Sequence, residues 1–230
     1  MTPRKNMDTD VRGQYEAYPY PPRDPADEAK RLITGSPSNI VEIEHYVFGR
    51  KLAADQPFRA LVAGGGTGDA TIMLASQLAA RGLMAEITHI DISGASLEIA
   101  RARAAARKLD SINFIQASLN DLTELGLEKF DYIDCCGVLH HLPEPAAGLH
   151  SLVAALRPKG GIGLMLYGRL GRTGVYEAQD LLRLIADDLP DTERVETARA
   201  LLDDLPPTNW LKRNSHIGDH HNAGDAGIYD

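Results

Sequence analysis

Cysteine is scarce in this sequence. The 230 residues include only two cysteines, Cys135 and Cys136, and they are neighbours. A framework of disulfides of the kind that stabilises small secreted domains is therefore excluded. Long apolar runs are also missing, and the first residues, MTPRKNMDTDVRG, contain no hydrophobic signal segment. These absences predict a cytoplasmic protein without a membrane span.

Positive charge is also in short supply. Lys and Arg number 24 against 32 Asp and Glu, which gives a formal net charge of −8 at pH 7. A broad nucleic-acid-binding surface is disfavoured, because duplex binding requires clustered basic residues. One local basic group has the spacing of a solvated helix face, and it comprises Arg101, Arg103, Arg107 and Lys108.

Strand-like and helix-like patterns alternate along the middle of the chain. The predicted strands are 58–63, 85–92, 112–117, 129–136 and 161–168. Helical patterns lie between them, at 69–82, 96–109 and from residue 145 to a Pro/Gly stop near 158–161. This alternation predicts βαβ units, and therefore an α/β fold with a parallel sheet and helices on both of its faces.

The segments before residue 58 and after residue 168 lack this alternation of strands and helices. Four prolines between Pro19 and Pro25 favour an extended, polyproline-like path. A helix is expected near 39–53, and its apolar stripe would be Ile40, Ile43, Val47 and Phe48. Leucines at helical spacing predict helices at 175–189 and 192–205, before a glycine- and histidine-rich end without periodicity. We therefore expect an N-terminal arm and helix (1–55), a ligand-binding domain (56–168) and a helical extension (169–230).

The strongest chemical signal is the glycine-rich turn in LVAGGGTGDA. Gly64, Gly66 and Gly68 stand between a strand and a helix, where glycine allows positive φ and close approach of a ligand to free helix N–H groups. The dinucleotide fingerprint would require a small residue at position 69, and Asp69 stands there instead. A nicotinamide-dependent dehydrogenase is therefore disfavoured.

Asp91 closes the second predicted strand. An acidic residue at this point accepts hydrogen bonds from the hydroxyls of a ribose. The alternative is a helix N-cap, for which Ser93 is also available. We prefer the ribose role, because strand, glycine loop and acid follow one another in the expected order.

Residues 58–168 resemble a class I S-adenosylmethionine (SAM)-dependent methyltransferase. The resemblance rests on five segments in order: VAGGGTGDA, HIDIS, FIQASLNDL, FDYIDCCGVLHHL and LRPKGGIGLMLY. It implies a doubly wound, mainly parallel, Rossmann-like sheet of strand order 3-2-1-4-5. It also implies SAM as cofactor, with the glycine loop around its methionine part, Asp91 at the ribose and Ser118 and Leu119 beside the adenine. Two departures, Val62 and Ser118 where the family often has acids, predict weaker cofactor binding.

The residues expected to bind the cofactor come from the arm and from four loops. They are Tyr15, Tyr20, Gly64, Gly65, Gly66, Thr67, Gly68, Asp91, Ile92, Ser118, Leu119, Cys136 and Gly137. In the segment YEAYPYPPRDP the tyrosines would fold over the cofactor as a lid. The alternative is an arm that covers hydrophobic surface elsewhere, and we prefer the lid.

The Cys-Cys and His-His pairs at 135–141 invite a metal-site interpretation. Successive side chains of a strand point to opposite faces, so both cysteines cannot bind one metal without distortion. We expect one cysteine in the core, the other at the cofactor pocket, and no metal, including at His216, His220 and His221. His140 or His141 is a candidate general base, against the alternative that one caps a helix and the other packs. In-line methyl transfer can also proceed by alignment without a base.

The function expected from this resemblance is methyl transfer from SAM to a small molecule or a protein. A non-catalytic SAM- or nucleotide-binding module is the alternative, and a dehydrogenase is less favoured. Sheets of this family usually end with two further strands, whereas the sequence after Gly168 offers none. The last strand would then be an edge with unpaired backbone groups. We expect the chain to be part of a longer protein, with a partner chain, a homo-oligomer or the helices as alternative cover for that edge.

Overall fold

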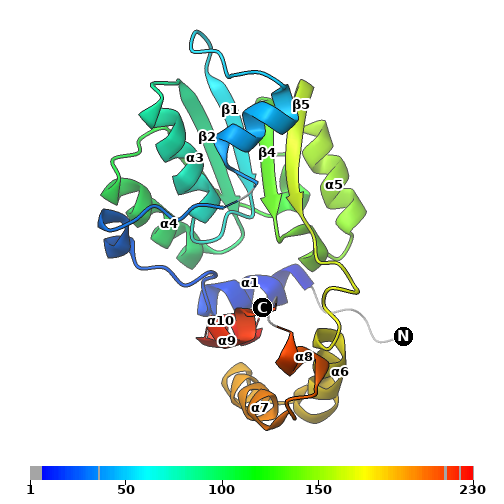
Figure 1. Ribbon diagram of the computed structural model, residues 1–230. Coiled ribbons are helices and arrows are strands. Elements are labelled where there is room, and N and C mark those ends of the chain that lie inside the picture. The colour runs from blue at the N-terminus through cyan, green and yellow to red at the C-terminus, as the bar shows by residue number, and fades with distance from the viewer. Residues whose placement is uncertain (1–6, 36, 215–216, 223, 230) are drawn as a thin grey trace. The chain divides into compact units, whose positions relative to one another are not determined.

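The computed structural model describes residues 7–35, 37–214, 217–222 and 224–229 (Figure 1). Two compact units divide the chain, the first ending at Leu166 and the second beginning at Tyr167. The first unit contains the sheet, and the second is helical.

A five-stranded parallel sheet forms the centre of the first unit. Its strands are β1 (Phe58–Ala63), β2 (Ala85–Asp91), β3 (Ile112–Gln116), β4 (Phe130–Cys136) and β5 (Leu156–Met165). They lie in the order β3-β2-β1-β4-β5. This confirms the fold and the strand order that the sequence predicts.

Helices pack on both faces of the sheet (Figure 1). One core layer lies under α3 (Asp69–Ala80) and includes Leu74, Leu78 and Tyr132. The other includes Ile133, Cys135 and Leu152 of α5 (Pro145–Ala154). Consecutive residues of β4 thus enter opposite layers, as the two-residue period of a strand requires. The helix α4 (Gly94–Ala106) follows β2, and a short 3-10 helix, η3 (Leu119–Asp121), follows β3.

The fifth strand begins earlier than its sequence pattern predicts. It starts at Leu156 rather than at residue 161, and α5 ends at Ala154. Leu156 pairs with Phe130, whereas Gly161 pairs with Tyr132, so the intervening residues form an irregularity in the strand. The Pro/Gly segment therefore lies inside β5 instead of closing the helix, because burial of Leu156 against the core outweighs the local breaker signal.

The N-terminal region contains a helix that the sequence analysis missed. The helix α1 (Met7–Ala17) precedes the prolines, and a 3-10 helix, η1 (Pro25–Ala29), begins at the last of them. The expected helix near 39–53 is shorter: α2 (Ile40–Glu42) continues as the π-helical segment η2 (Ile43–Phe48). Ile40 and Ile43 are buried at its start, as its apolar stripe predicts.

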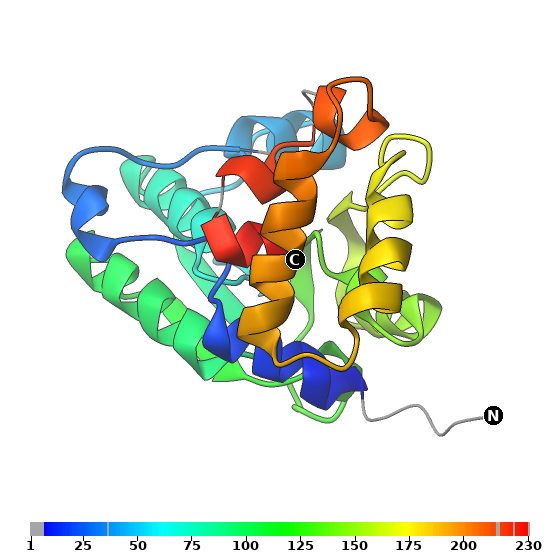
Figure 2. The ribbon, with the colours of Figure 1, turned by 90° about the horizontal axis from the view of Figure 1, so that it is seen from below.

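The second unit contains five helices in its described residues. α6 (Val175–Ala186) and α7 (Asp191–Asp204) lie side by side, close to the predicted ranges (Figure 2). α8 (Trp210–Arg213), α9 (Asp219–Asn222) and α10 (Gly224–Tyr229) correct the expectation of an irregular end. Asn209 caps α8 by accepting from the Leu211 amide, and Arg199 pairs with Asp225. Local caps and an ion pair order this segment without hydrophobic periodicity.

The structure bears on two predictions from composition, the lack of a membrane span and the solvated basic group. None of the helices in the described part of the chain is long and apolar enough to cross a membrane. The basic group on α4 is not a uniformly solvated face, because Arg103 is only 1% exposed and bonds to carboxylates. That correction bears on the site, since one of those carboxylates belongs to Asp69. His216 lies outside the described residues.

Candidate functional site

The glycine loop joins the carboxyl end of β1 to α3 and wraps around the end of β2. The amides of Gly64 and Gly65 donate to the Ile90 carbonyl over 2.8 and 3.1 Å. Gly66 has φ +53° and donates its amide to Asp91 Oδ2 over 2.7 Å. Gly68, with φ +102°, is the N-cap of α3. Positive φ at these positions is costly for other residues, so the loop path depends on glycine.

Asp91 is 8% exposed at the end of β2. Its Oδ1 accepts from the Ser93 amide over 2.9 Å, while the Ser93 hydroxyl caps α4 by accepting from Ser96. Ser93, and not Asp91, is therefore the N-cap of α4. Burial raises the pKa of Asp91, although hydrogen bonds from nearby backbone amides oppose the rise. Because a carboxylate offers about four acceptor positions, acceptor capacity remains for another donor beside the amides of Ser93, Gly66 and Ile92.

The N-terminal arm lies directly against the glycine loop. The Tyr20 carbonyl accepts from the Thr67 amide over 3.3 Å, and the Thr67 hydroxyl donates to the Pro21 carbonyl over 2.6 Å. A Cβ at Gly66 would come within 2.5 Å of the Tyr20 oxygen. Glycine at position 66 is therefore required both by φ and by contact with the arm.

Asp69 joins the arm to the first helix after the loop. Arg23 donates to both of its carboxylate oxygens, from Nε over 2.9 Å and from Nη2 over 2.6 Å. Arg103 donates to Asp69 Oδ1 and to Glu28 Oε1, each over 2.7 Å. Burial alone would raise the pKa of Asp69, but the hydrogen bonds from Arg23 and Arg103 outweigh it and lower the pKa. Asp69, which departs from the dinucleotide fingerprint, therefore anchors the arm through Arg23.

The end of α1 approaches the segment that follows β4. Tyr15 Oη lies 3.5 Å from His141 Nε2, with the two rings edge to face at 6.2 Å between centroids. His140 and His141 belong to the 3-10 helix η4 (Leu139–His141), and their rings lie 4.3 Å apart. The sequence does not distinguish His140 from His141 as a candidate base, whereas in the structure His141 is the one that contacts Tyr15 of the arm.

The cysteines at the end of β4 behave as the strand period predicts. Cys135 is buried in the core, Cys136 is half-buried, and both are free thiols. Burial raises the pKa of Cys135 to about 12 and that of Cys136 to about 11. Within the described residues no three His, Cys, Asp or Glu side chains are placed to hold a metal ion.

The remaining predicted site residues lie at the carboxyl ends of neighbouring strands. Ser118 accepts from the Asn120 amide over 3.2 Å and caps η3, while the Leu119 side chain is buried in the core. The Ile92 carbonyl accepts from the Gln116 side chain over 3.1 Å. Gly137, with φ +75°, donates to the Met165 carbonyl over 3.1 Å. A ligand at this site could therefore contact the backbone of Leu119 but not its side chain.

His89 is a residue near the loop that the sequence analysis did not single out. It is fully buried beneath the loop, and a Cβ at Gly65 would fall 2.4 Å from its Cε1. Its Nδ1 lies 2.8 Å from the Thr71 hydroxyl. Burial lowers the pKa of His89 to about 4, so the ring is neutral near pH 7. The available signal was a histidine inside the predicted buried strand, in the segment ITHID, directly before Ile90.

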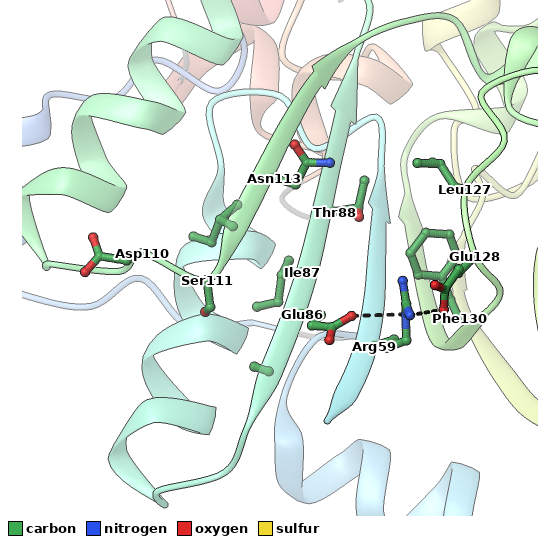
Figure 3. Close-up of a pocket in the computed structure, with 12 residues that line it drawn as sticks. Arg59, Glu86, Ile87, Thr88, Asp110, Ser111, Asn113, Leu127, Glu128 and Phe130 are labelled. Carbon is green, nitrogen blue, oxygen red and sulfur yellow. Dashed lines mark hydrogen bonds and ion pairs between the residues drawn. The ribbon is translucent and has the colours of Figure 1, made fainter. Parts of the chain in front are cut away.

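A separate cavity of about 420 Å³ lies toward the amino ends of β1, β2 and β3 (Figure 3). Polar side chains on its wall include those of Arg59, Glu86, Thr88 and Asn113, and Arg59 pairs with Glu86 and Glu128. None of the predicted site residues lines it. The predicted site therefore gathers at the opposite, carboxyl ends of the strands, where ligands of open parallel sheets bind.

Comparison with known proteins agrees with this geometry. Residues 61–162 match the family model described as a methyltransferase domain. Residues 61–162 therefore form a methyltransferase domain of the class I SAM-dependent type. The chain is 35% identical over 212 residues to an uncharacterized protein, syc1184_c, of Synechococcus sp., a match that covers 88% of the chain and 48% of the relative. It is 28% identical over 125 residues to a ubiquinone biosynthesis O-methyltransferase of Alkalilimnicola ehrlichii, which covers 53% of the chain and 49% of the relative.

One solved structure carries the comparison of folds. PKMT2 from Rickettsia typhi, solved in complex with AdoHcy, is 20% identical to the methyltransferase with a TM-score of 0.53. The match covers 74% of this chain and 34% of that protein, and at this identity it shows the fold alone. The chain spans about half the length of the two curated relatives named above.

Proposed function

We propose that this methyltransferase transfers a methyl group from SAM to a small-molecule or protein acceptor. The observation that carries the proposal is the hydrogen bond of 2.7 Å between the Gly66 amide and Asp91 Oδ2. It fixes a glycine loop and a buried carboxylate side by side at the carboxyl ends of adjacent parallel strands. A nucleoside ligand requires that pairing: backbone that it can approach closely and an acceptor for its ribose hydroxyls.

The residues present fit SAM. Asp91 is an 8% exposed carboxylate that retains acceptor capacity for the hydroxyls of a ribose. We propose that residues 64–68 hold the methionine part and that Ser118, Leu119 and Ile92 flank the adenine. Cys136 and Gly137 would border the reacting end, and Tyr15 and Tyr20 would close the site as a lid. The contacts of the arm with Thr67 and with His141 support the lid.

We propose a hydroxyl as the methylated group. Several relatives are named as O-methyltransferases, and the contact of His141 with Tyr15 of the arm supports a role for His141 as the base that receives a hydroxyl proton. SAM, held by residues 64–68 and Asp91, would supply a methyl group attached to a positively charged sulfur. The acceptor oxygen would take the methyl carbon in line, with S-adenosylhomocysteine as the leaving group. His141 would take the proton released from that oxygen, with Tyr15 holding its imidazole. Walls formed by the arm would exclude water and align the acceptor, which lowers the barrier further.

Two other functions predict different behaviour. A non-catalytic SAM-binding module would bind the cofactor without consuming it. A dehydrogenase would place a pyrophosphate at the start of α3, where the Asp69 carboxylate stands, and like charges there are unfavourable. Among the described residues β5 pairs with β4 on one side only, which supports the proposal that a second copy or another partner chain covers its other side.

One experiment separates these functions. Titration calorimetry with S-adenosylhomocysteine and NAD, side by side, should give binding of the first and none of the second. Turnover is then followed as S-adenosylhomocysteine release with matched pairs of phenol and aniline acceptors. Tight binding without turnover of any acceptor favours the non-catalytic module, and binding of NAD alone overturns the proposal.

A further inference from the structure

The end of α1 contacts three loops of the predicted site. Tyr15 and Glu16 are adjacent, and their bonds reach the turn after β2, the end of β3 and the segment after β4. Two consecutive residues thus hold partners that lie 78 to 126 positions further along the chain. No motif of the family resemblance includes Glu16.

Glu16 satisfies the free N-terminal amides of α4. Its Oε1 accepts from the Gly94 amide over 2.8 Å, and its Oε2 accepts from the Ala95 amide over 3.0 Å. These hydrogen bonds lower the pKa of Glu16, so it is ionised at neutral pH and its charge opposes the positive end of the helix dipole. The Ser93 hydroxyl takes the next amide, so the start of α4 is capped by two segments of the chain together.

The same turn presents Asp91. Ser93 donates its amide to Asp91 Oδ1 over 2.9 Å and its hydroxyl to the Tyr15 carbonyl over 2.9 Å. The backbone of α1, the cap of α4 and the carboxylate at the ribose position are therefore connected through one residue. Tyr15 extends the connection to His141, on the side proposed for the acceptor.

We propose that Glu16 is a positioning residue that couples docking of α1 to cofactor binding. When α1 is docked, Glu16 fixes the turn after β2, and Asp91 is held in the orientation that a ribose requires. When α1 is undocked, the amides of Gly94 and Ala95 turn to water and the turn loosens. The docked helix also brings Tyr15 to His141, so the acceptor side is completed in the same step. This inference rests on the proposed function.

Thermodynamic linkage makes the coupling measurable in two directions. If docked α1 strengthens cofactor binding by some factor, bound cofactor must strengthen docking of α1 by the same factor. Loss of charge-assisted hydrogen bonds of this kind predicts a factor of about 10. A cap that merely stabilises α4 would shift the melting temperature without changing exchange in α1 on cofactor binding.

The test uses Glu16→Ala, Glu16→Gln and the matched control Glu98→Ala, whose glutamate lies on the exposed face of α4. S-adenosylhomocysteine affinity is measured by calorimetry, and amide exchange of residues 12–17 is measured with and without that ligand. We expect about 10-fold weaker binding for Glu16→Ala, partial recovery for Glu16→Gln and no change for Glu98→Ala. In the unsubstituted protein the ligand should slow exchange of residues 12–17 by a comparable factor.

The outcomes separate the inference from the function on which it rests. If the unsubstituted protein binds the ligand and Glu16→Ala binds it equally well, the coupling is wrong and the proposed function stands. If exchange of residues 12–17 does not respond to the ligand, the coupling is again wrong, even if Glu16→Ala fails to fold. If the unsubstituted protein does not bind the ligand, the proposed cofactor site itself is wrong.

Discussion

The Gly66 amide lies 2.7 Å from Asp91 Oδ2, across 25 positions of sequence. This bond joins the two features that a nucleoside site requires, a loop without side chains and a buried acceptor. It also explains why the loop turns back toward β2 instead of continuing along β1.

Replacing Asp91 with alanine should weaken S-adenosylhomocysteine binding by about 1–3 kcal/mol, because the ribose hydroxyls lose a charged acceptor. Calorimetry measures the change. Asp110→Ala is the control, because that aspartate is exposed at the other end of the sheet. Equal affinity of Asp91→Ala and the unsubstituted protein would remove Asp91 from the site.

Replacing His141 with alanine should lower kcat by about 100-fold or more if it removes the acceptor proton. The loss of S-adenosylhomocysteine affinity should be much smaller than the loss in kcat, since the ribose and methionine contacts lie elsewhere and only the contact of Tyr15 with His141 is removed. The exposed His150 on α5 provides a control, His150→Ala, with unchanged kcat. Unchanged turnover in His141→Ala would show that alignment alone suffices.

Replacing Arg103 with methionine should destabilise the first unit by about 3–5 kcal/mol, because Glu28 and Asp69 lose a buried partner. Urea denaturation measures the free energy of unfolding. Arg101→Met, on the more exposed side of the same helix, should cost less than about 1 kcal/mol. Similar losses in both variants would contradict the structural role given to Arg103.

Asp134 should make stability depend on pH. Its side chain is 1% exposed and accepts from the Ser38 hydroxyl, and burial raises its pKa from 3.8 to about 6. The folded protein therefore holds this proton more tightly than the unfolded chain. The stabilising contribution is complete below about pH 4 and is lost as pH rises through about 6.

The variant Asp134→Asn keeps an acceptor for Ser38 but cannot ionise. Its advantage in unfolding free energy over the unsubstituted protein should grow between pH 4 and 7, to about 3 kcal/mol. His89, which titrates in the same range, is common to both proteins and cancels in the difference. A difference that stays constant across this pH range would mean that Asp134 titrates normally.

Chelators should leave both stability and cofactor binding unchanged, because the two cysteines face opposite sides of β4. Elemental analysis of the purified protein checks this directly. Stoichiometric zinc that disappears in Cys136→Ser would overturn the prediction, and Cys135→Ser, in the core, distinguishes loss of metal from loss of packing.

The parallel sheet could be predicted from the sequence alone. The alternation of apolar strands and helices between residues 58 and 168 predicts five parallel strands, and the glycine turn and Asp91 mark their carboxyl ends. These features are local: strand period, helix propensity and positive φ act over a few residues. The family resemblance then supplied the strand order that the structure confirms.

The contacts between the N-terminal arm and this sheet could not be predicted from the sequence, because they join residues that are far apart in the chain. Nothing local indicates that Glu16 caps α4 or that Arg103, one of several arginines in an alanine-rich helix, is buried between Glu28 and Asp69. The early start of β5 at Leu156 was also hidden, because Pro158 and Gly160 read as a helix stop. In each case a long-range contact or burial outweighs the local preference, and such energies become visible only when distant segments are brought together.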